Sequence, residues 1–305
     1  MRIPRLVLTF GLVAGLLAAP AAATATSFSG ALGAAPAAVT APPLLVSVRA
    51  TSHAGYDRVV WEFRGGLPAH RDARYVPSLL GDGSGLPIRI AGDAILRVSM
   101  FDANAHNPDT NRATAPSRLV VGLPNVIELV QSGDFEAHVS YGVGLAKRQA
   151  FRMFTLTNPS RVVLDVRKDY PPVSRTVTFQ DLPRFVAGTT PDTRAVRRTI
   201  PALAPASAVL HHLFAGPTAS ERAVGLRTVR SGATDFDRLS ISAGVARVRL
   251  LGGCNSGGST FTIANLIMPT LKQFSTVRFV KIYDPSGRTA RPTGPSDSIP
   301  ACLEP

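Results

Sequence analysis

Short runs in which apolar and polar residues alternate fill residues 44–166, with turn-forming residues between them. In the run from residue 58 to residue 63, Val59, Trp61 and Phe63 would share one face of a strand, and residues 139–145 repeat the pattern. Further strands are expected at 44–49, 74–80, 95–101, 125–131, 151–157 and 161–166. Strands at this spacing predict an all-β sandwich or barrel.

The pattern changes after Tyr170-Pro-Pro-Val-Ser174, which we interpret as a boundary because consecutive prolines cannot sit inside a sheet. A strand at 176–179 and a loop lead to residues 205–215, where apolar residues recur three and four apart and predict an amphipathic helix. Thr218-Ala-Ser-Glu221 has the spacing of a capping box and predicts a second, shorter helix.

A β-hairpin that turns at Ala243-Gly244, a helix over residues 261–271 and a closing strand at 277–283 complete the chain. Pro269 should kink that helix or restart it. We therefore expect a β-sandwich domain at 43–168 and a small α/β domain at 174–305, whose two main helices cover one face of a small sheet.

The first 26 residues have the layout of a cleavable signal peptide: a basic start, an apolar run and Ala-Thr-Ala at 23–25. The apolar run is shorter than the ~20 residues of a comfortable bilayer span. We expect a secreted, cell-wall-associated chain without a transmembrane span after cleavage, the alternative being an uncleaved anchor. Residues 27–42 are small and uncharged, and predict a flexible linker.

Basic residues are concentrated in the second half of the chain. Residues 27–170 hold 15 basic and 12 acidic side chains, whereas residues 171–305 hold 16 and 8. Such a surface favours an anionic wall polymer or membrane surface as partner. Export and the absence of aromatics interleaved with arginine argue against nucleic acid. An alternative is a coding bias, since arginine outnumbers lysine 29 to 4.

Cys254 and Cys302 are the two cysteines, and in an exported chain they predict a disulfide. Two buried free thiols are the alternative. Two cysteines without nearby histidines do not complete a metal site.

The remaining candidates for chemistry fall short of known motifs. In the loop 252–260, Gly258 stands where a phosphate-binding loop needs lysine, so a tethered loop with a helix cap at Ser259 or Thr260 is expected. His211 and His212 are adjacent on a helix, and we expect one to be exposed and the other to lie at the edge of the core. The acidic residues of the β-domain turns are interpreted as turn formers, and not as a paired-carboxylate site: Asp82, Asp93, Asp134 and Glu136. No catalytic, cofactor-binding or metal-binding residue is predicted.

Residues 43–168 contain several distinctive motifs in order: Gly55-Tyr-Asp-Arg-Val-Val-Trp-Glu-Phe63, Gly81-Asp-Gly-Ser-Gly85, Ile90-Ala-Gly-Asp93, Gly133-Asp-Phe-Glu136, Gly142-Val-Gly-Leu145 and the run 151–166. These motifs give the segment a resemblance to the AMIN-like domain of secreted bacterial proteins. This resemblance implies a compact β-sandwich that binds the envelope, with peptidoglycan the suspected ligand and no catalysis.

The second half has its own set of motifs: Leu213-Phe-Ala-Gly-Pro-Thr218, Glu221, Gly225-Leu226, Gly244-Val-Ala-Arg-Val-Arg-Leu250 and the segments 270–274 and 277–283. In these residues it is similar to the GerMN domain of sporulation, spore germination and envelope proteins. The resemblance implies an α/β module that contacts other proteins. Met268-Pro269 departs from the family pattern, which calls for an uninterrupted helix.

Together these features predict a non-enzymatic envelope protein that binds peptidoglycan or an associated polyanion through its first domain and an envelope protein through its second, without a cofactor. Two alternatives stay open. One is a wall-modifying hydrolase whose site carries no familiar motif, and the other is an envelope regulator that signals to a membrane partner.

Overall fold

The computed structural model describes residues 41–305. The predicted signal peptide at 1–26 and residues 27–40 of the predicted linker lie outside the described residues. The described residues cluster into one compact unit. Within it we name residues 43–168 the sandwich region and residues 172–305 the C-terminal region.

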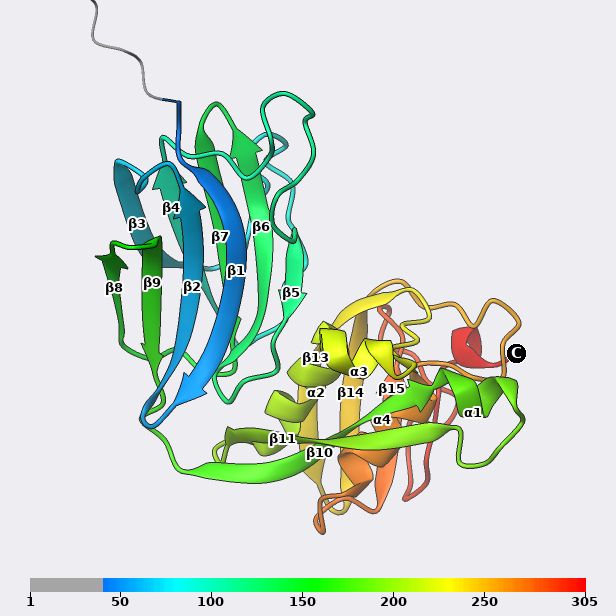
Figure 1. The fold of residues 1–305 in the computed structure, drawn as a ribbon. Helices are drawn as coiled ribbons and strands as arrows, with labels where there is room; N and C mark the ends of the chain where they lie inside the picture. The colour runs from blue at the N-terminus through cyan, green and yellow to red at the C-terminus, as the bar shows by residue number, and fades with distance from the viewer. Residues whose placement is uncertain (1–40) are drawn as a thin grey trace, which may run out of the picture. The chain divides into compact units, whose positions relative to one another are not determined.

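Two antiparallel sheets make up the sandwich region, one with strand order β1-β2-β9-β8 and the other with order β3-β4-β7-β6-β5 (Figure 1). The first sheet consists of β1 (Leu44–His53), β2 (Tyr56–Arg64), β9 (Ser160–Arg167) and β8 (Phe151–Leu156). The second consists of β3 (His70–Val76), β4 (Ala94–Phe101), β7 (His138–Leu145), β6 (Val126–Phe135) and β5 (Arg118–Val120).

The core of the sandwich region follows the predicted alternation. Val59, Trp61 and Phe63 are buried on one face of β2, as expected, and they share a cluster with alternate residues of β4 and β7. One predicted strand is displaced: β3 ends at Val76, whereas the sequence predicted a strand over 74–80. Pro77 has no N–H for the ladder and starts a loop instead.

That loop, residues 77–93, lies on the outer face of the five-stranded sheet. Leu79 and Ile90 are buried there. The close approach depends on glycines in the strands below. A Cβ at Gly133 would lie 2.2 Å from Asp82 Oδ2, and one at Gly144 would lie 2.1 Å from the carbonyl oxygen of Ala91. Because glycine has no side chain, these two positions allow the loop and Asp82 to lie directly against the strands.

The C-terminal region contains two three-stranded sheets, with orders β11-β10-β12 and β13-β14-β15. Helices α2 and α4 lie between them, because α2 packs on β10, β11 and β13, and α4 packs on β10 and β15 (Figure 1). The elements are β10 (Pro172–Asp181), α1 (Leu182–Val186), β11 (Thr193–Pro201), α2 (Pro205–Ala215), α3 (Ala219–Ala223), β12 (Leu226–Arg227), β13 (Ala233–Ser242), β14 (Val245–Gly252), α4 (Ala264–Lys272), β15 (Phe279–Tyr283) and a 3-10 turn, η1 (Ala301–Leu303).

This arrangement corrects the expectation of a single small sheet covered on one face. The prolines of the predicted boundary at 170–174 are not all outside a sheet, because β10 begins at Pro172, where the first position of the strand tolerates the missing N–H. The segment 193–201, predicted as loop, is β11, an edge strand that pairs only with β10.

The helices follow the sequence more closely. Helix α2 has the predicted bounds, and the capping box of α3 is present, with Thr218 N–H donating to Glu221 Oε2 at 2.8 Å. Helix α4 runs from Ala264 to Lys272 and includes Pro269 without interruption. The predicted cap at Ser259 or Thr260 is wrong, because Ser259 accepts from Phe261 N–H and the helix starts at Ala264.

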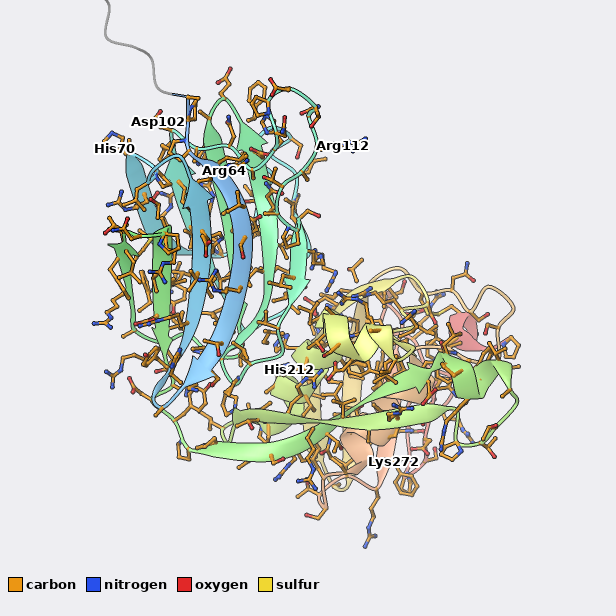
Figure 2. The ribbon with its side chains drawn as sticks, viewed as in Figure 1. Arg64, His70, Asp102, Arg112, His212 and Lys272 are labelled. Atoms are coloured by element: carbon orange, nitrogen blue, oxygen red, sulfur yellow. A yellow bond between two sulfur atoms is a disulfide. The ribbon has the colours of Figure 1, made fainter. Side chains whose placement is uncertain are left out.

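Both histidines of α2 are buried, which contradicts the prediction that one is exposed. His211 is 8 % and His212 1 % exposed, because α2 packs on β10 and β11 of one sheet and on β13 of the other. Figure 2 shows His212 on this helix. Burial lowers the pKa of His211 to about 4 and that of His212 to about 3, since the interior disfavours the charged ring. Both rings are therefore neutral at pH 7.

A disulfide joins Cys254 to Cys302, with a Cα–Cα distance of 5.6 Å. It lies beside a backbone hydrogen bond from Ser256 N–H to the carbonyl oxygen of Cys302 at 2.7 Å. The end of the chain is thus attached to the loop that follows β14.

Candidate binding surface on the five-stranded sheet

The outer face of the five-stranded sheet carries polar and aromatic side chains in rows set by strand register. One row pairs Arg74 of β3 with Arg97 of β4, and another pairs Phe101 of β4 with His138 of β7. His138 also pairs with Phe135 of β6. Paired residues in antiparallel strands share a face, so each row presents its side chains together.

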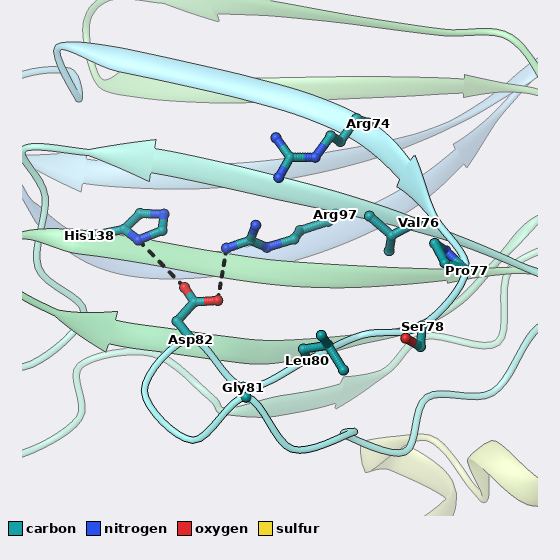
Figure 3. A pocket seen from close by; sticks show the side chains of 10 residues that line it. Arg74, Val76, Pro77, Ser78, Leu80, Gly81, Asp82, Arg97 and His138 are labelled. Carbon is teal, nitrogen blue, oxygen red and sulfur yellow. Dashed lines mark hydrogen bonds and ion pairs between the residues drawn. The ribbon is translucent and has the colours of Figure 1, made fainter.

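A groove of ≈ 560 Å³ opens on this face where the 77–93 loop meets the strands. Arg74, Arg97 and His138 come from three strands, and Asp82 comes from the loop (Figure 3). The remaining lining residues are Val76, Pro77, Ser78, Leu80, Gly81 and Gly85. The groove therefore combines cationic groups, one carboxylate and an apolar rim.

Asp82 is the centre of a polar network within the groove. Its Oδ1 accepts from Arg97 Nη2 at 2.8 Å, and its Oδ2 accepts from the hydroxyl of Ser140 at 2.6 Å. His138 Nδ1 lies 3.5 Å from the same Oδ2. The Asp82 N–H donates to the carbonyl oxygen of Ser132, which ties the loop to β6. The carboxylate is thus held in place and organises the cations around it.

Two side-chain nitrogens of this network are unpaired within the described residues. Arg97 Nε and His138 Nε2 are buried without a hydrogen-bond partner. Arg74 is the most exposed cation, at 61 % for its side chain, and its one ion pair, with Asp72 at 3.2 Å, is also exposed. Arg74 can therefore reach a ligand without breaking a buried contact.

An aromatic row borders the groove. Phe101 and His138 stack with their ring centroids 4.3 Å apart and their planes 4° from parallel. Phe101 is 40 % and Phe135 69 % exposed, which is high for large apolar side chains. Exposed aromatic faces are typical of sites that stack on flat or ring-shaped ligands.

The acidic turn residues do not converge on one site. Asp134 accepts from Ala105 N–H at 2.9 Å and contacts His106 Nδ1 at 2.8 Å, in a network separate from that of Asp82. Glu136 and Asp93 are exposed. Of the four carboxylates that the sequence singled out, only Asp82 lies in the groove, as part of a cation-rich network and not as one of a pair.

The sequence did not identify the other functional candidates on this face, namely Arg74, Arg97, Phe101 and Phe135. Their signal was weak, because arginine on a half-exposed strand is common. The run Gly133-Asp-Phe-Glu136 contains Phe135, but the sequence analysis used it only as a motif of the AMIN-like resemblance, and the structure places Phe135 at the end of β6, paired with His138 of β7.

The described residues show neither a group of His, Cys, Asp and Glu side chains suited to hold a metal ion nor a helix long and apolar enough to cross a membrane. Cys254 is in a disulfide and cannot act as a nucleophile in this state.

Comparison with protein families gives one match: residues 43–168 match the model of the AMIN-like domain. These are the bounds of the resemblance noted in the sequence, and they coincide with the sandwich region. The family is associated with the cell envelope and with peptidoglycan binding. Comparisons with curated proteins and with solved structures found no match.

Proposed function

We propose that this protein is a non-enzymatic, secreted component of the bacterial envelope that binds peptidoglycan through the outer face of its five-stranded sheet. The observation that carries the proposal is the groove around Asp82, with its cations and its aromatic border, inside the segment that matches the AMIN-like domain. The binding surface consists of Arg74, Arg97, His138, Phe101 and Phe135.

The chemistry of this surface suits a wall glycan. Peptidoglycan presents carboxylates on its peptides and flat pyranose rings on its sugar strands. Arg74 and Arg97 supply guanidinium groups, which bind carboxylates in a two-pronged geometry. Phe101 and Phe135 supply exposed ring faces against which a sugar can pack.

Binding without chemistry is supported by the separate networks of Asp82 and Asp134, because a hydrolase of the two-carboxylate kind needs two acids that face one substrate bond. The competing hydrolase would release soluble fragments from peptidoglycan, and the binding protein would not. Incubating the protein with insoluble peptidoglycan and measuring both its retention and the released fragments therefore tests the two hypotheses together.

The C-terminal region extends this proposal. Its similarity to GerMN domains supports a role in contacting an envelope protein, and the signal-like residues 1–26 support export. The disulfide agrees with an oxidising compartment outside the cytosol.

Co-sedimentation of the purified protein with insoluble peptidoglycan tests the proposal. Phe135→Ala and Arg74→Gln should each weaken retention about five-fold, the effect of losing roughly 1 kcal/mol of contact. Both side chains are exposed, so stability should change by less than about 0.5 kcal/mol.

Matched controls lie elsewhere on the chain. Phe185 is 41 % exposed, a fraction similar to the 40 % of Phe101. Arg49 forms an exposed ion pair with Glu62 on the other sheet of the sandwich region. Phe185→Ala and Arg49→Gln should leave retention unchanged. Failure of the wild-type protein to sediment, or equal losses in the controls, would overturn the proposed surface.

A further inference from the structure

A second cavity, of ≈ 300 Å³, is lined by four arginines. Arg118 comes from β5, Arg222 from α3, Arg227 from β12, and Arg230 from the turn before β13. The other lining residues are Val120, Ala215, Gly216, Pro217 and Thr228. Among the described residues, no acidic side chain lines this cavity.

The four arginines keep most of their donors free. Each guanidinium carries five N–H groups. Arg222 donates to the carbonyl oxygen of Pro217, Arg227 to those of Arg222 and Leu226, and Arg230 to that of Phe214. These contacts go to backbone carbonyls, which hold these three side chains in place without neutralising their charge, whereas Arg118 pairs with the carboxylate of Glu128.

Two buried polar atoms at the cavity have no partner. They are Arg230 Nε and the hydroxyl oxygen of Thr228. Gly216 leaves room beside them, because a Cβ at this position would lie 3.3 Å from the Thr228 hydroxyl and 3.9 Å from Arg230 Nη2. A buried donor without an acceptor is costly, so an acceptor is expected to occupy this place in the functional protein.

The nearest carboxylates are already engaged. Glu128 is fully buried and bonded to Arg118 Nη1 at 2.5 Å, while Glu221 holds Arg198 through two hydrogen bonds of 2.6 and 2.7 Å. Burial and the neighbouring charge of Arg89 lower the pKa of Arg230 to about 10. A bound anion would stabilise the charged form of Arg230, which burial and the repulsion from Arg89 disfavour.

We propose that this cavity is a binding site for a phosphoryl group, as inorganic phosphate or as the phosphate of an ester. A phosphoryl group carries up to two negative charges and three strong acceptor oxygens, which matches converging guanidinium groups and a hydroxyl donor better than a carboxylate with two oxygens does. The site goes beyond the proposed peptidoglycan surface and shares none of its residues.

Calorimetric titration of the full chain with pyrophosphate at constant ionic strength tests the site, with inorganic phosphate and glycerol 3-phosphate as parallel arms. We expect saturable binding of one pyrophosphate per chain. Arg230→Gln should weaken it at least ten-fold, and the double variant Arg222→Gln with Arg227→Gln should weaken it similarly. Preference for glycerol 3-phosphate over inorganic phosphate would identify an ester as the ligand, and the reverse would identify the free anion.

Arg291→Gln is the matched control, since it removes the same charge from an exposed position of the C-terminal region. It should bind pyrophosphate like the wild-type protein, and so should Arg74→Gln, which separates this site from the peptidoglycan surface. If Arg230→Gln fails to fold, the exposed pair Arg222 and Arg227 still decides the question. Absence of binding, equal weakening by Arg291→Gln, or equal affinity for acetate would overturn the proposal.

Discussion

In the sandwich region the buried carboxylates are paired, whereas in the C-terminal region the buried histidines are not. Asp165 accepts from Arg58 at 2.6 and 2.9 Å and from Arg152 at 3.1 and 3.2 Å. His211 Nδ1 and His212 Nε2, by contrast, are buried without partners. The buried carboxylates are stabilised by opposite charges, whereas the two histidines are kept neutral by the exclusion of water, although the C-terminal region also holds a buried ion pair between Arg198 and Glu221.

Because of this difference, the two regions are expected to lose stability at different pH values. Desolvation opposes the charge on Asp165, but hydrogen bonds from Arg58 and Arg152 prevail and lower its pKa. The resulting stability is lost only as the pH falls below the ordinary aspartate range near 4. The histidines have folded-state pKa values below the unfolded value of about 6.5, so below that pH the unfolded chain binds more protons and stability falls. Mild acid should therefore weaken the C-terminal region first.

The largest expected effect comes from removing the disulfide with Cys254→Ser and Cys302→Ser. The bond closes a loop of 48 residues, so its loss should destabilise the C-terminal region by about 4 kcal/mol on the chain-entropy model. Hydrogen exchange of β14 amides should accelerate, while the urea midpoint followed by fluorescence of Trp61, the single tryptophan, should not change.

The reduced wild-type protein serves as the control, because it lacks the bond but keeps both side chains. If Trp61 fluorescence reports the same loss of unfolding free energy as β14 exchange, the two regions unfold as one cooperative unit and do not differ in stability.

An intermediate effect is expected for His212→Leu, which replaces a buried neutral ring with an apolar side chain. The variant should gain stability relative to the wild type as the pH is lowered, by about 2 kcal/mol at pH 5, because 1.4 kcal/mol accompanies each pH unit below 6.5. Exchange of β14 amides, corrected for the intrinsic effect of pH, measures this difference.

His53→Leu is the matched control for that series, since His53 is exposed in the sandwich region. Its difference from the wild type should stay constant between pH 7 and pH 5. A constant difference for His212→Leu as well would show that His212 is charged or solvated in the folded protein.

The smallest effect is expected for Thr218→Ala, which removes the capping hydroxyl of the five-residue helix α3. The change should weaken α3 locally by about 1 kcal/mol, seen as faster exchange of the Glu221 amide that the hydroxyl accepts from. Thr218→Ser should restore protection, and the exposed Thr110→Ala should have no effect. A shift of the Trp61 midpoint would mean that the perturbation spreads into the sandwich region.

The periodicity of apolar residues correctly predicted the strands and helices whose surroundings are typical of their class. The buried face of β2 and the bounds of α2 follow from spacing alone. The strand β11 was missed because its arginine-rich sequence reads as a solvated loop, although Val196 and Ile200 lie toward the interior. The prediction that one of His211 and His212 is exposed was wrong, because two adjacent helical residues cannot both be buried only where one side of the helix faces water.

The candidate site was beyond prediction for a different reason. Asp82, Arg97 and His138 are separated by up to 56 positions in the sequence. The register of β4 and β7 places Arg97 and His138 on one face, and the 77–93 loop, tied to β6 through Asp82, brings the carboxylate to them. The motifs that carry the AMIN-like resemblance did contain Asp82 and Gly133, but they gave no indication that the two are in contact.

The contact between Gly133 and Asp82 also means that the shape of the groove is encoded partly in residues that no ligand touches. A methyl group at Gly133 would displace Asp82, and one at Gly144 would displace the loop at Ala91, although neither change alters a side chain that lines the groove. In natural variants, altered ligand preference would then track small changes in backbone shape as much as changes in the recognition residues themselves.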